Sequence, residues 1–125
     1  MEPVFKKCEL CGNIVSMILQ AGPSVVCCGK PMEQLIPGTV DASHEKHLPH
    51  LIWAGEILKV QVGSVIHPMT AEHHITFIYV QTDKGGQMKF LPQESEPVAN
   101  FIFKDEKAIA VYEYCNLHGL WKTEC

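Results

Sequence analysis

Tyr114-Cys115-Asn116-Leu117-His118-Gly119, a short stretch close to the C-terminus, is the part of the sequence around which we organise the rest. It places a thiol and an imidazole, two common ligands of transition metals, with only two residues between them. Asn116 and Gly119 are typical of turns, so the pair is expected in a loop. Three further well-spaced histidines stand upstream: His47, His67 and His73. The sequence therefore indicates a metal site assembled from distant segments.

Size and composition describe a folded protein of one or two small domains. The chain has 125 residues, of which 46% are hydrophobic and 19% are charged, as in globular rather than disordered proteins. The formal net charge is −4, and no basic cluster interrupts the sequence. General nucleic-acid binding is therefore not expected.

Neither a membrane span nor a secretion signal is predicted. No apolar run approaches the roughly 20 residues that a transmembrane helix needs. The N-terminal residues Met1-Glu2-Pro3-Val4-Phe5-Lys6-Lys7 lack the apolar segment of a signal peptide. We therefore expect a cytoplasmic protein.

Four of the six cysteines have the spacing of metal ligands. Disulfides are less expected, because thiols in the cytoplasm stay reduced. In Cys8-Glu9-Leu10-Cys11-Gly12 the spacing lets two sulfurs bind one ion, and the glycine permits an unusual backbone turn. The adjacent pair Cys27-Cys28 supplies two more sulfurs. The predicted site is a tetrahedral S4 centre that suits iron or zinc.

The adjacent cysteines distinguish this segment from a common structural zinc ribbon, which usually has two Cys-x-x-Cys pairs. Neighbouring side chains must splay to reach one ion and so distort the tetrahedron. With Cys8, Cys11, Cys27 and Cys28 in this arrangement, the segment resembles desulforedoxin and its iron–tetrathiolate centre. Spacing alone leaves iron and zinc open. So small a unit has little core, and the metal is expected to hold it together.

A division into two domains follows from the spacing of these motifs. Residues 1–36 hold the four cysteines, with a short strand over Asn13–Leu19, and Pro37-Gly38-Thr39 is expected to be the linker. Residues 37–125 form the second domain. Its first segment, Val40–Pro49, has no clear period and is predicted to be a loop over the mouth of that domain.

Strand signals dominate the second domain, and no segment has a convincing helical period. The predicted strands are Glu56–Val62, His74–Gln81, Gln87–Leu91, Val98–Phe103 and Ala108–Tyr114. Turn residues separate them at intervals of about 8–12 residues, as is typical of β-sandwiches. We therefore predict a mainly β protein, with a small metal-binding domain followed by an antiparallel β-sandwich.

Several of the seven histidines have simpler explanations than metal binding. An isolated histidine is usually a surface or hydrogen-bonded residue, and this reading is preferred for His44 and His50. His73 and His74 are adjacent, so on a strand they would point to opposite faces. One can be a ligand, and composition alone does not say which.

Three motifs together resemble a known family. Glu45-Lys46-His47, then Gly63-Ser64-Val65-Ile66-His67-Pro68-Met69 with a histidine six residues on, then Cys115-Asn116-Leu117-His118-Gly119, look like superoxide reductase. Together with the N-terminal cysteines, the whole chain resembles desulfoferrodoxin, the two-iron form of that enzyme. The resemblance implies a desulforedoxin-like, rubredoxin-type iron domain at 1–36. It also implies an immunoglobulin-like β-sandwich at 37–125 that carries the catalytic iron.

The resemblance implies a role for each candidate residue of the second domain. The equatorial and axial ligands of the catalytic iron would be His47, His67, His73, His118 and Cys115. Glu45 would ligate the ferric iron after turnover, and Lys46 would place positive charge beside the open position. Without the resemblance, these two would be read as a solvated loop pair of little energetic weight. His74 stands where an aromatic residue is common, and Leu120 where some relatives carry a histidine.

The implied activity is the one-electron reduction of superoxide to hydrogen peroxide, which removes superoxide from the cell. Two irons per chain, a rubredoxin-like electron donor and a homodimer follow from the same resemblance, with zinc possible in the N-terminal site. The competing readings are an electron carrier, a zinc-stabilised binding module and a dismutase, which consumes no reductant. Cys125 matches nothing in the pattern and is expected to be a free thiol, while Trp53 and Trp121 are expected in the core or an interface.

Overall fold

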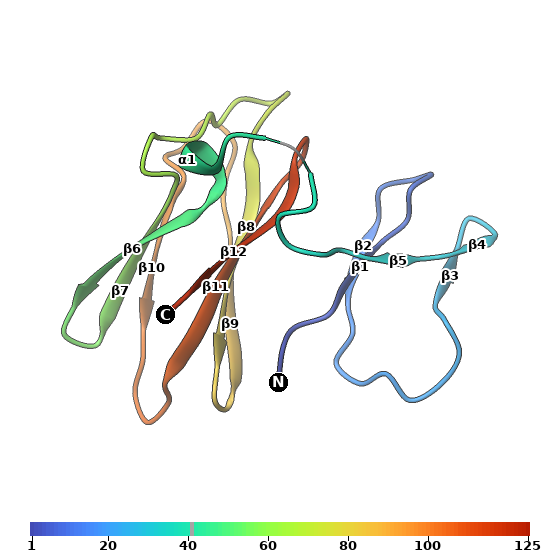
Figure 1. The fold of residues 1–125 in the computed structure, drawn as a ribbon, viewed down its shortest axis with the longest axis horizontal. Coiled ribbons are helices and arrows are strands. Elements are labelled where there is room, and N and C mark those ends of the chain that lie inside the picture. Colours follow the sequence, from blue (N-terminus) through green and yellow to red (C-terminus); the bar gives the residue numbers. More distant parts are fainter. Residues whose placement is uncertain (41) are drawn as a thin grey trace. The chain divides into compact units, whose positions relative to one another are not determined.

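The chain forms two compact units in the computed structural model, which describes residues 1–40 and 42–125 (Figure 1). The units are Met1–Ile36 and Pro37–Cys125. Strands make up nearly all the regular structure, and every paired strand is antiparallel. The predicted fold class, a small metal-binding unit followed by an antiparallel β-sandwich, is confirmed.

The first unit consists of very short strands. Its three-stranded sheet has the order β2-β1-β5, with β1 at Phe5–Lys7, β2 at Ile14–Ser16 and β5 at Glu33–Gln34. The predicted strand Asn13–Leu19 is thus shorter than expected. Ile18 and Leu19 are 86% and 73% exposed, so no apolar face continues the strand beyond Ser16. Only Phe5, Cys8 and Met32 are buried in this unit, which agrees with the small core that we predicted.

A two-residue β-hairpin carries the adjacent cysteines. Its strands are β3 at Val26–Cys27 and β4 at Lys30–Pro31, with Cys27 paired to Lys30. Cys28 and Gly29 form the turn, and their φ angles are +52° and +77°. Positive φ at both central residues is the signature of a type I′ turn, whose twist matches that of the flanking strands. Adjacent cysteines can therefore serve one site because one ends a strand and the other begins a turn.

The second unit is a sandwich of two sheets. One has the order β10-β7-β6, with β6 at Pro49–Ala54, β7 at Ile57–Val62 and β10 at Val98–Ile102. The other has the order β12-β11-β8-β9, with β8 at Ile75–Thr82, β9 at Gly85–Phe90, β11 at Ala108–Cys115 and β12 at Gly119–Glu124. Buried and exposed residues alternate along β7, as expected for a strand with one face on a core. The core is built from side chains of both sheets: Leu58, Val60, Val62, Phe101, Ile78, Val80 and Val111.

Three elements of the second unit differ from the sequence-based prediction. The segment Val40–Pro49 was predicted to be a loop, but His44–His47 form a single helical turn, α1, and residue 41 lies outside the described residues. Strands β6 and β12 were not predicted. Buried and exposed side chains do not alternate regularly along either strand, so neither shows the pattern that marks a half-buried strand. Pro49 opens β6, a position where a strand tolerates proline.

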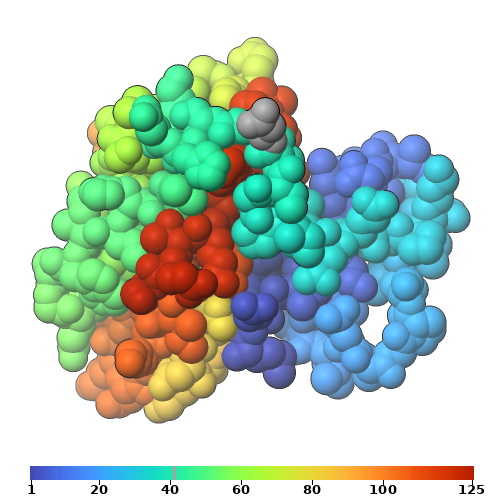
Figure 2. Space-filling model, in the orientation of Figure 1, coloured from blue at the N-terminus to red at the C-terminus, as the bar shows by residue number. Residues whose placement is uncertain are grey.

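The segments that carry the candidate ligands gather at one end of the sandwich. Helix α1, the β7–β8 connection and the β11–β12 turn lie together at this end (Figure 1). A hydrogen bond joins the edge strands β6 and β12, because Thr123 Oγ1 donates to the Pro49 carbonyl at 2.8 Å. Figure 2 shows the C-terminal strand, in red, against the green segment that contains α1 and β6.

No helix in the described part of the chain is long and apolar enough to cross a membrane.

The type I′ turn generates a prediction about the first unit. An added Cβ at Gly29 or at Gly22 would meet no heavy atom within 4 Å, but only Gly29 has a positive φ. Gly29→Ala should therefore cost about 1 kcal/mol through backbone strain alone. Competition with a chelator should show a roughly fivefold weaker hold on the metal of the cysteine site. Gly22→Ala is the matched control. Equal metal retention in the two variants would contradict the turn assignment.

Candidate metal centres

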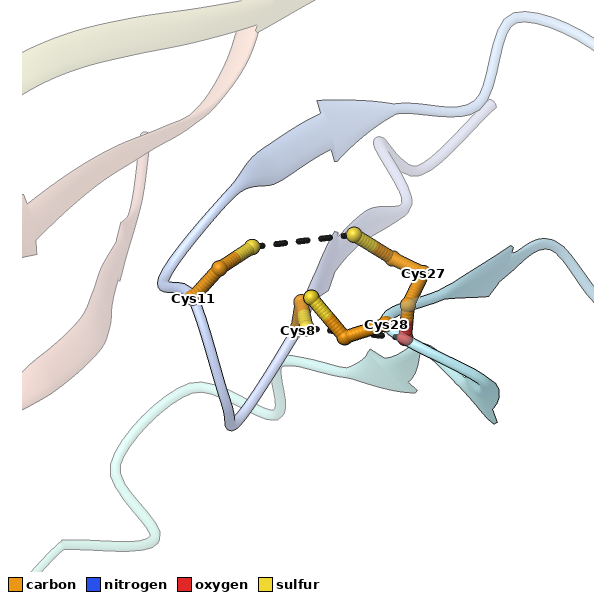
Figure 3. Close-up of side chains that lie close together, drawn as sticks. All are labelled: Cys8, Cys11, Cys27 and Cys28. Carbon is orange, nitrogen blue, oxygen red and sulfur yellow. Dashed lines mark hydrogen bonds between the residues drawn. The ribbon is translucent and has the colours of Figure 1, made fainter.

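Four cysteines converge in the first unit. Cys8 and Cys11 lie in the β1–β2 connection, and Cys27 and Cys28 come from the β3–β4 hairpin (Figure 3). Their four sulfur atoms all lie within 4.8 Å of one another. A tight turn shapes the first pair, because the Gly12 N–H donates to the Cys8 carbonyl at 2.8 Å and Gly12 has a φ of +83°. The geometry therefore fits a single metal ion bound by four sulfurs.

The pKa values of these thiols shift in different directions. The backbone N–H of Cys11 lowers the pKa of Cys8 to about 6. The interaction with the Cys11 sulfur raises the pKa of Cys28 to about 12, and the pKa of Cys27 is raised by the same neighbour. Four thiolates this close would repel one another, so only a cation between them can keep all four deprotonated.

A second group of potential ligands converges in the sandwich. The ligand atoms of four residues lie within 4.8 Å of one another: His47, His67, His73 and Cys115. His47 ends α1, His67 lies in the β7–β8 connection, His73 precedes β8, and Cys115 ends β11. Three of the four are buried. The fold thus brings together residues that are as many as 68 positions apart in the sequence.

Backbone carbonyls orient two of the imidazole rings. His47 Nδ1 lies 2.7 Å from the Ser43 carbonyl oxygen, and His67 Nδ1 lies 2.6 Å from the Pro68 carbonyl oxygen. A carbonyl oxygen only accepts, so each Nδ1 must carry the proton. In the neutral rings Nε2 then presents a lone pair, and the two Nε2 atoms are 3.3 Å apart. Metal-binding histidines are typically oriented in this way.

His73 supplies the clearest sign that a cation belongs in this group. Its Nε2 atom is buried and has no hydrogen-bond partner within the described residues. A buried polar atom without a partner is costly, and a metal ion among the converging nitrogens would remove that cost. The residues present therefore fit a metal centre.

His118 stands beside this group and is not one of its four members. Its Nδ1 lies 3.0 Å from His47 Nε2 and 3.9 Å from Cys115 Sγ. The sequence predicted four histidines and one cysteine, whereas the tightly convergent set has three histidines and one cysteine. His118 faces the set with Nδ1 and is held in place by its carbonyl, which accepts from Trp121 Nε1 at 3.0 Å.

Burial keeps the imidazoles neutral. It lowers the pKa of His67 to about 4, and it also lowers the pKa values of His47 and His73. Neutral imidazole is the form that binds a metal. Burial has the opposite consequence for the thiol, because it raises the pKa of Cys115. A cation is therefore required to hold Cys115 as a thiolate.

A buried acid accompanies the thiol on the same face of β11. Glu113 has 0% exposure, and neither carboxyl oxygen has a hydrogen-bond partner within the described residues. Burial raises the pKa of Glu113 well above its usual value. The raised pKa favours the neutral carboxyl group, which limits its repulsion of a thiolate on Cys115.

Glu45 and Lys46 are exposed side chains on the one-turn helix that carries His47. Lys46 directly precedes His47, and its charge adds to the effect of burial in lowering the pKa values of His47 and His73. The backbone of this turn is fixed, because the Val65 N–H donates to the Glu45 carbonyl at 3.1 Å. A Cβ on Gly63 would lie 2.7 Å from the Lys46 carbonyl oxygen, so only glycine permits this close approach.

Trp121 is a neighbour of the site that the sequence analysis assigned only to the core or an interface. It is indeed buried, but its ring also stacks on His47 at 5.0 Å and meets His44 edge-on at 5.2 Å. The feature of the sequence that could have indicated this contact is the position of Trp121, three residues after His118. The adjacent histidines separate as predicted, since His73 faces the group while His74 Nδ1 lies 3.0 Å from the Thr70 carbonyl oxygen.

The remaining candidates join neither group. His50 is exposed on β6, and Leu120 is buried on β12 opposite Tyr114. Cys125 is exposed and lines a surface cavity with Trp53 and Phe103, whose rings are 5.8 Å apart.

Comparison with known families covers nearly the whole chain. A family model described as desulfoferrodoxin matches residues 39–124, and a model of the desulfoferrodoxin N-terminal domain matches residues 3–35. These two matches correspond to the two compact units of the structure.

Individual relatives agree with the family models. Desulfoferrodoxin of Nitratidesulfovibrio vulgaris is 45% identical over 94% of this chain and 93% of its own length. Superoxide reductase of Pyrococcus abyssi is 36% identical and matches 67% of this chain and 89% of its own length. The crystal structure of superoxide reductase from Treponema pallidum superposes with a TM-score of 0.83 at 40% identity, covering 99% of this chain and all of that one. The chain therefore belongs to the desulfoferrodoxin family.

Proposed function

We propose that this protein is a superoxide reductase. Superoxide gains one electron and two protons and leaves as hydrogen peroxide. The observation that carries the proposal is the convergence of three neutral imidazoles with a buried thiol at one end of the sandwich. Family relatives and solved structures that are named superoxide reductase support it.

We assign the ligands of the catalytic iron to the four-residue group together with its neighbour: His47, His67, His73, Cys115 and His118. His118 completes the set because its Nδ1 is directed at the group and lies 3.0 Å from His47 Nε2. Iron, when bound, supplies the single electron that superoxide accepts. Four imidazole rings and one thiolate would hold the iron and would leave room for one small anion to bind it.

The protein holds these ligands in a dry and rigid setting. The Ser43 and Pro68 carbonyls fix the tautomers of His47 and His67, and Trp121 covers His47 on one side. Cys115 has 0% exposure, so its thiolate charge is little screened by water. When iron is bound, the Cys115 thiolate would donate electron density to the metal.

Lys46 is proposed to attract the substrate. The protein carries a formal charge of −4, so a superoxide anion meets general repulsion. An exposed ammonium close to His47 and His73 offers a local positive field at the mouth of the site. We also propose that Lys46 orders water for the protons that the product requires.

Glu45 is proposed to close the site between turnovers. It is exposed and immediately precedes Lys46 on α1. A carboxylate is a good ligand for an oxidised iron, so Glu45 can occupy the open position until the metal is reduced again.

The first unit is proposed to be a desulforedoxin-like iron domain, residues 1–36, with iron or zinc in its S4 site. The second unit, residues 37–125, is proposed to hold the catalytic iron. We further propose that a rubredoxin-like donor supplies the electrons, that the protein is a cytoplasmic homodimer, and that its role is detoxification. An electron carrier is the less favoured function, because carriers usually keep their metals fully coordinated by protein.

Superoxide turnover tests the function directly. Purified protein should contain two irons per chain, remove superoxide, and consume one equivalent of reductant for each superoxide removed. Cys115→Ser should abolish the thiolate-to-iron absorption that appears on oxidation, because oxygen replaces the sulfur donor, and Cys125→Ser is the matched control. Turnover without consumption of reductant would indicate a dismutase. An unchanged absorption band in Cys115→Ser would remove Cys115 from the ligand set.

Lys46→Met should slow superoxide capture about tenfold at low ionic strength, because the local attraction for the anion is lost. The rate of the variant should also depend less on salt than that of the wild type. Rapid-mixing kinetics at several salt concentrations measure both effects. Lys84→Met, in the β8–β9 turn at the other end of the sandwich, removes the same charge as a control. If both variants slow equally, the effect reflects net charge rather than steering.

Glu45→Ala should leave superoxide capture intact and keep the oxidised site open to other anions. Added azide should therefore shift the visible spectrum of the oxidised variant at concentrations that leave the wild type unchanged. Glu56→Ala, in the β6–β7 turn, controls for the loss of a carboxylate. Identical azide titrations of wild type and Glu45→Ala would show that Glu45 does not close the site.

A further inference from the structure

Asn116 ties together two ligand-bearing segments that are more than 40 residues apart. Its N–H donates to the His74 carbonyl at 3.2 Å. Its side-chain Oδ1 accepts from the His74 N–H at 2.8 Å, and its Nδ2 donates to the Glu72 carbonyl at 2.9 Å. The side chain is therefore hydrogen-bonded to the backbone of the residues before and after His73.

The hydrogen bonds of Asn116 take over from strand pairing at the end of the β8–β11 ladder. Strands β8 and β11 pair regularly from Ala110 and Gln81 to Tyr114 and Phe77, and the register then shifts before Cys115 pairs with Ile75. Beyond that irregularity one backbone hydrogen bond, from the Asn116 N–H to the His74 carbonyl, continues toward the segment that carries His73. The side-chain amide of Asn116 supplies one hydrogen-bond acceptor and one donor where strand pairing would otherwise continue.

His73 depends on this backbone support more than its partners do. His47 and His67 each donate through Nδ1 to a carbonyl that orients the ring. No ring hydrogen bond is found for His73 among the described residues, and its Nε2 is without a partner. Thr70 Oγ1 accepts from the His73 N–H at 3.1 Å, so this residue too is held through its main chain.

The side chain at position 116 must combine two abilities. It has to accept from one N–H and donate to one carbonyl, and it has to reach both from the residue that follows Cys115. Asparagine meets these requirements. Aspartate keeps the acceptor but has no donor, and alanine has neither.

We infer that Asn116 is a positioning residue of the metal centre, which fixes His73 relative to Cys115 and His118. The inference rests on the proposed metal site but not on superoxide as the substrate. It assigns to this side chain a role beyond that of a turn former. The role is equivalent to that of the carbonyls to which His47 and His67 donate through Nδ1.

The test compares Asn116→Ala and Asn116→Asp with wild type in the full-length, iron-loaded protein. Loss of iron to a chelator is followed separately for the two centres by their visible spectra. In Asn116→Ala the histidine–cysteine centre should lose iron about tenfold faster and its thiolate-to-iron band should shift, because an outer contact typically changes metal affinity 10- to 100-fold. The S4 centre should be unchanged and serves as an internal control. Asn116→Asp should be intermediate.

Thermal unfolding of the metal-free proteins separates positioning from general stability. If Asn116→Ala lowers the melting temperature while band position and iron loss remain as in wild type, the role is structural and the inference is overturned. Asn100→Ala, an exposed site on β10, should change neither property. Wild-type protein without a thiolate-to-iron band would overturn the metal site and the inference with it. Spectral changes in Asn116→Ala would support the inference even if superoxide turnover were absent.

Discussion

The second unit depends on one electrostatic constraint, which is the convergence of several potential metal-ligand atoms at one largely buried point. His47 Nε2 and His67 Nε2 lie 3.3 Å apart, and both are acceptors because carbonyls hold the proton of each ring on Nδ1. His73 Nε2 is buried without a partner in the described structure. Such an arrangement is unfavourable unless a cation lies between the donor atoms. The sandwich supplies the rigidity that keeps these atoms together.

The two candidate centres bring their ligand atoms together in different ways. In the first unit, short-range geometry is enough, because a tight turn at Gly12 and a type I′ turn at Cys28-Gly29 aim four sulfurs at one point. Little apolar surface is buried there, so the metal must contribute much of the stability. In the second unit the candidate ligands come from three separated segments, and the buried core between two sheets positions them.

Contacts just outside the ligand set give the catalytic site its shape. Backbone carbonyls choose the tautomers, Trp121 stacks on His47, and the Asn116 amide joins the loops of His73 and Cys115. Gly63 lets the β7–β8 connection pack against the carbonyls of α1, so the helix that carries Lys46 and His47 has a fixed place. These contacts leave Glu45 and Lys46 exposed, where they can meet an incoming anion.

The sequence by itself determined the class of fold and the five strands β7, β8, β9, β10 and β11 to within about two residues, and it singled out the cysteines and histidines that converge in the two groups. Spacing identifies the cysteine site because its geometry is local, and the motif around Cys115 identifies the other by family resemblance. Edge strands β6 and β12 and the single turn of α1 could not be predicted, since their pattern depends on what packs against them. Only the tertiary structure decided which nitrogen each histidine presents and that Asn116 and Trp121 belong to the site. Those features arise from hydrogen bonds and ring contacts between segments that the sequence keeps far apart.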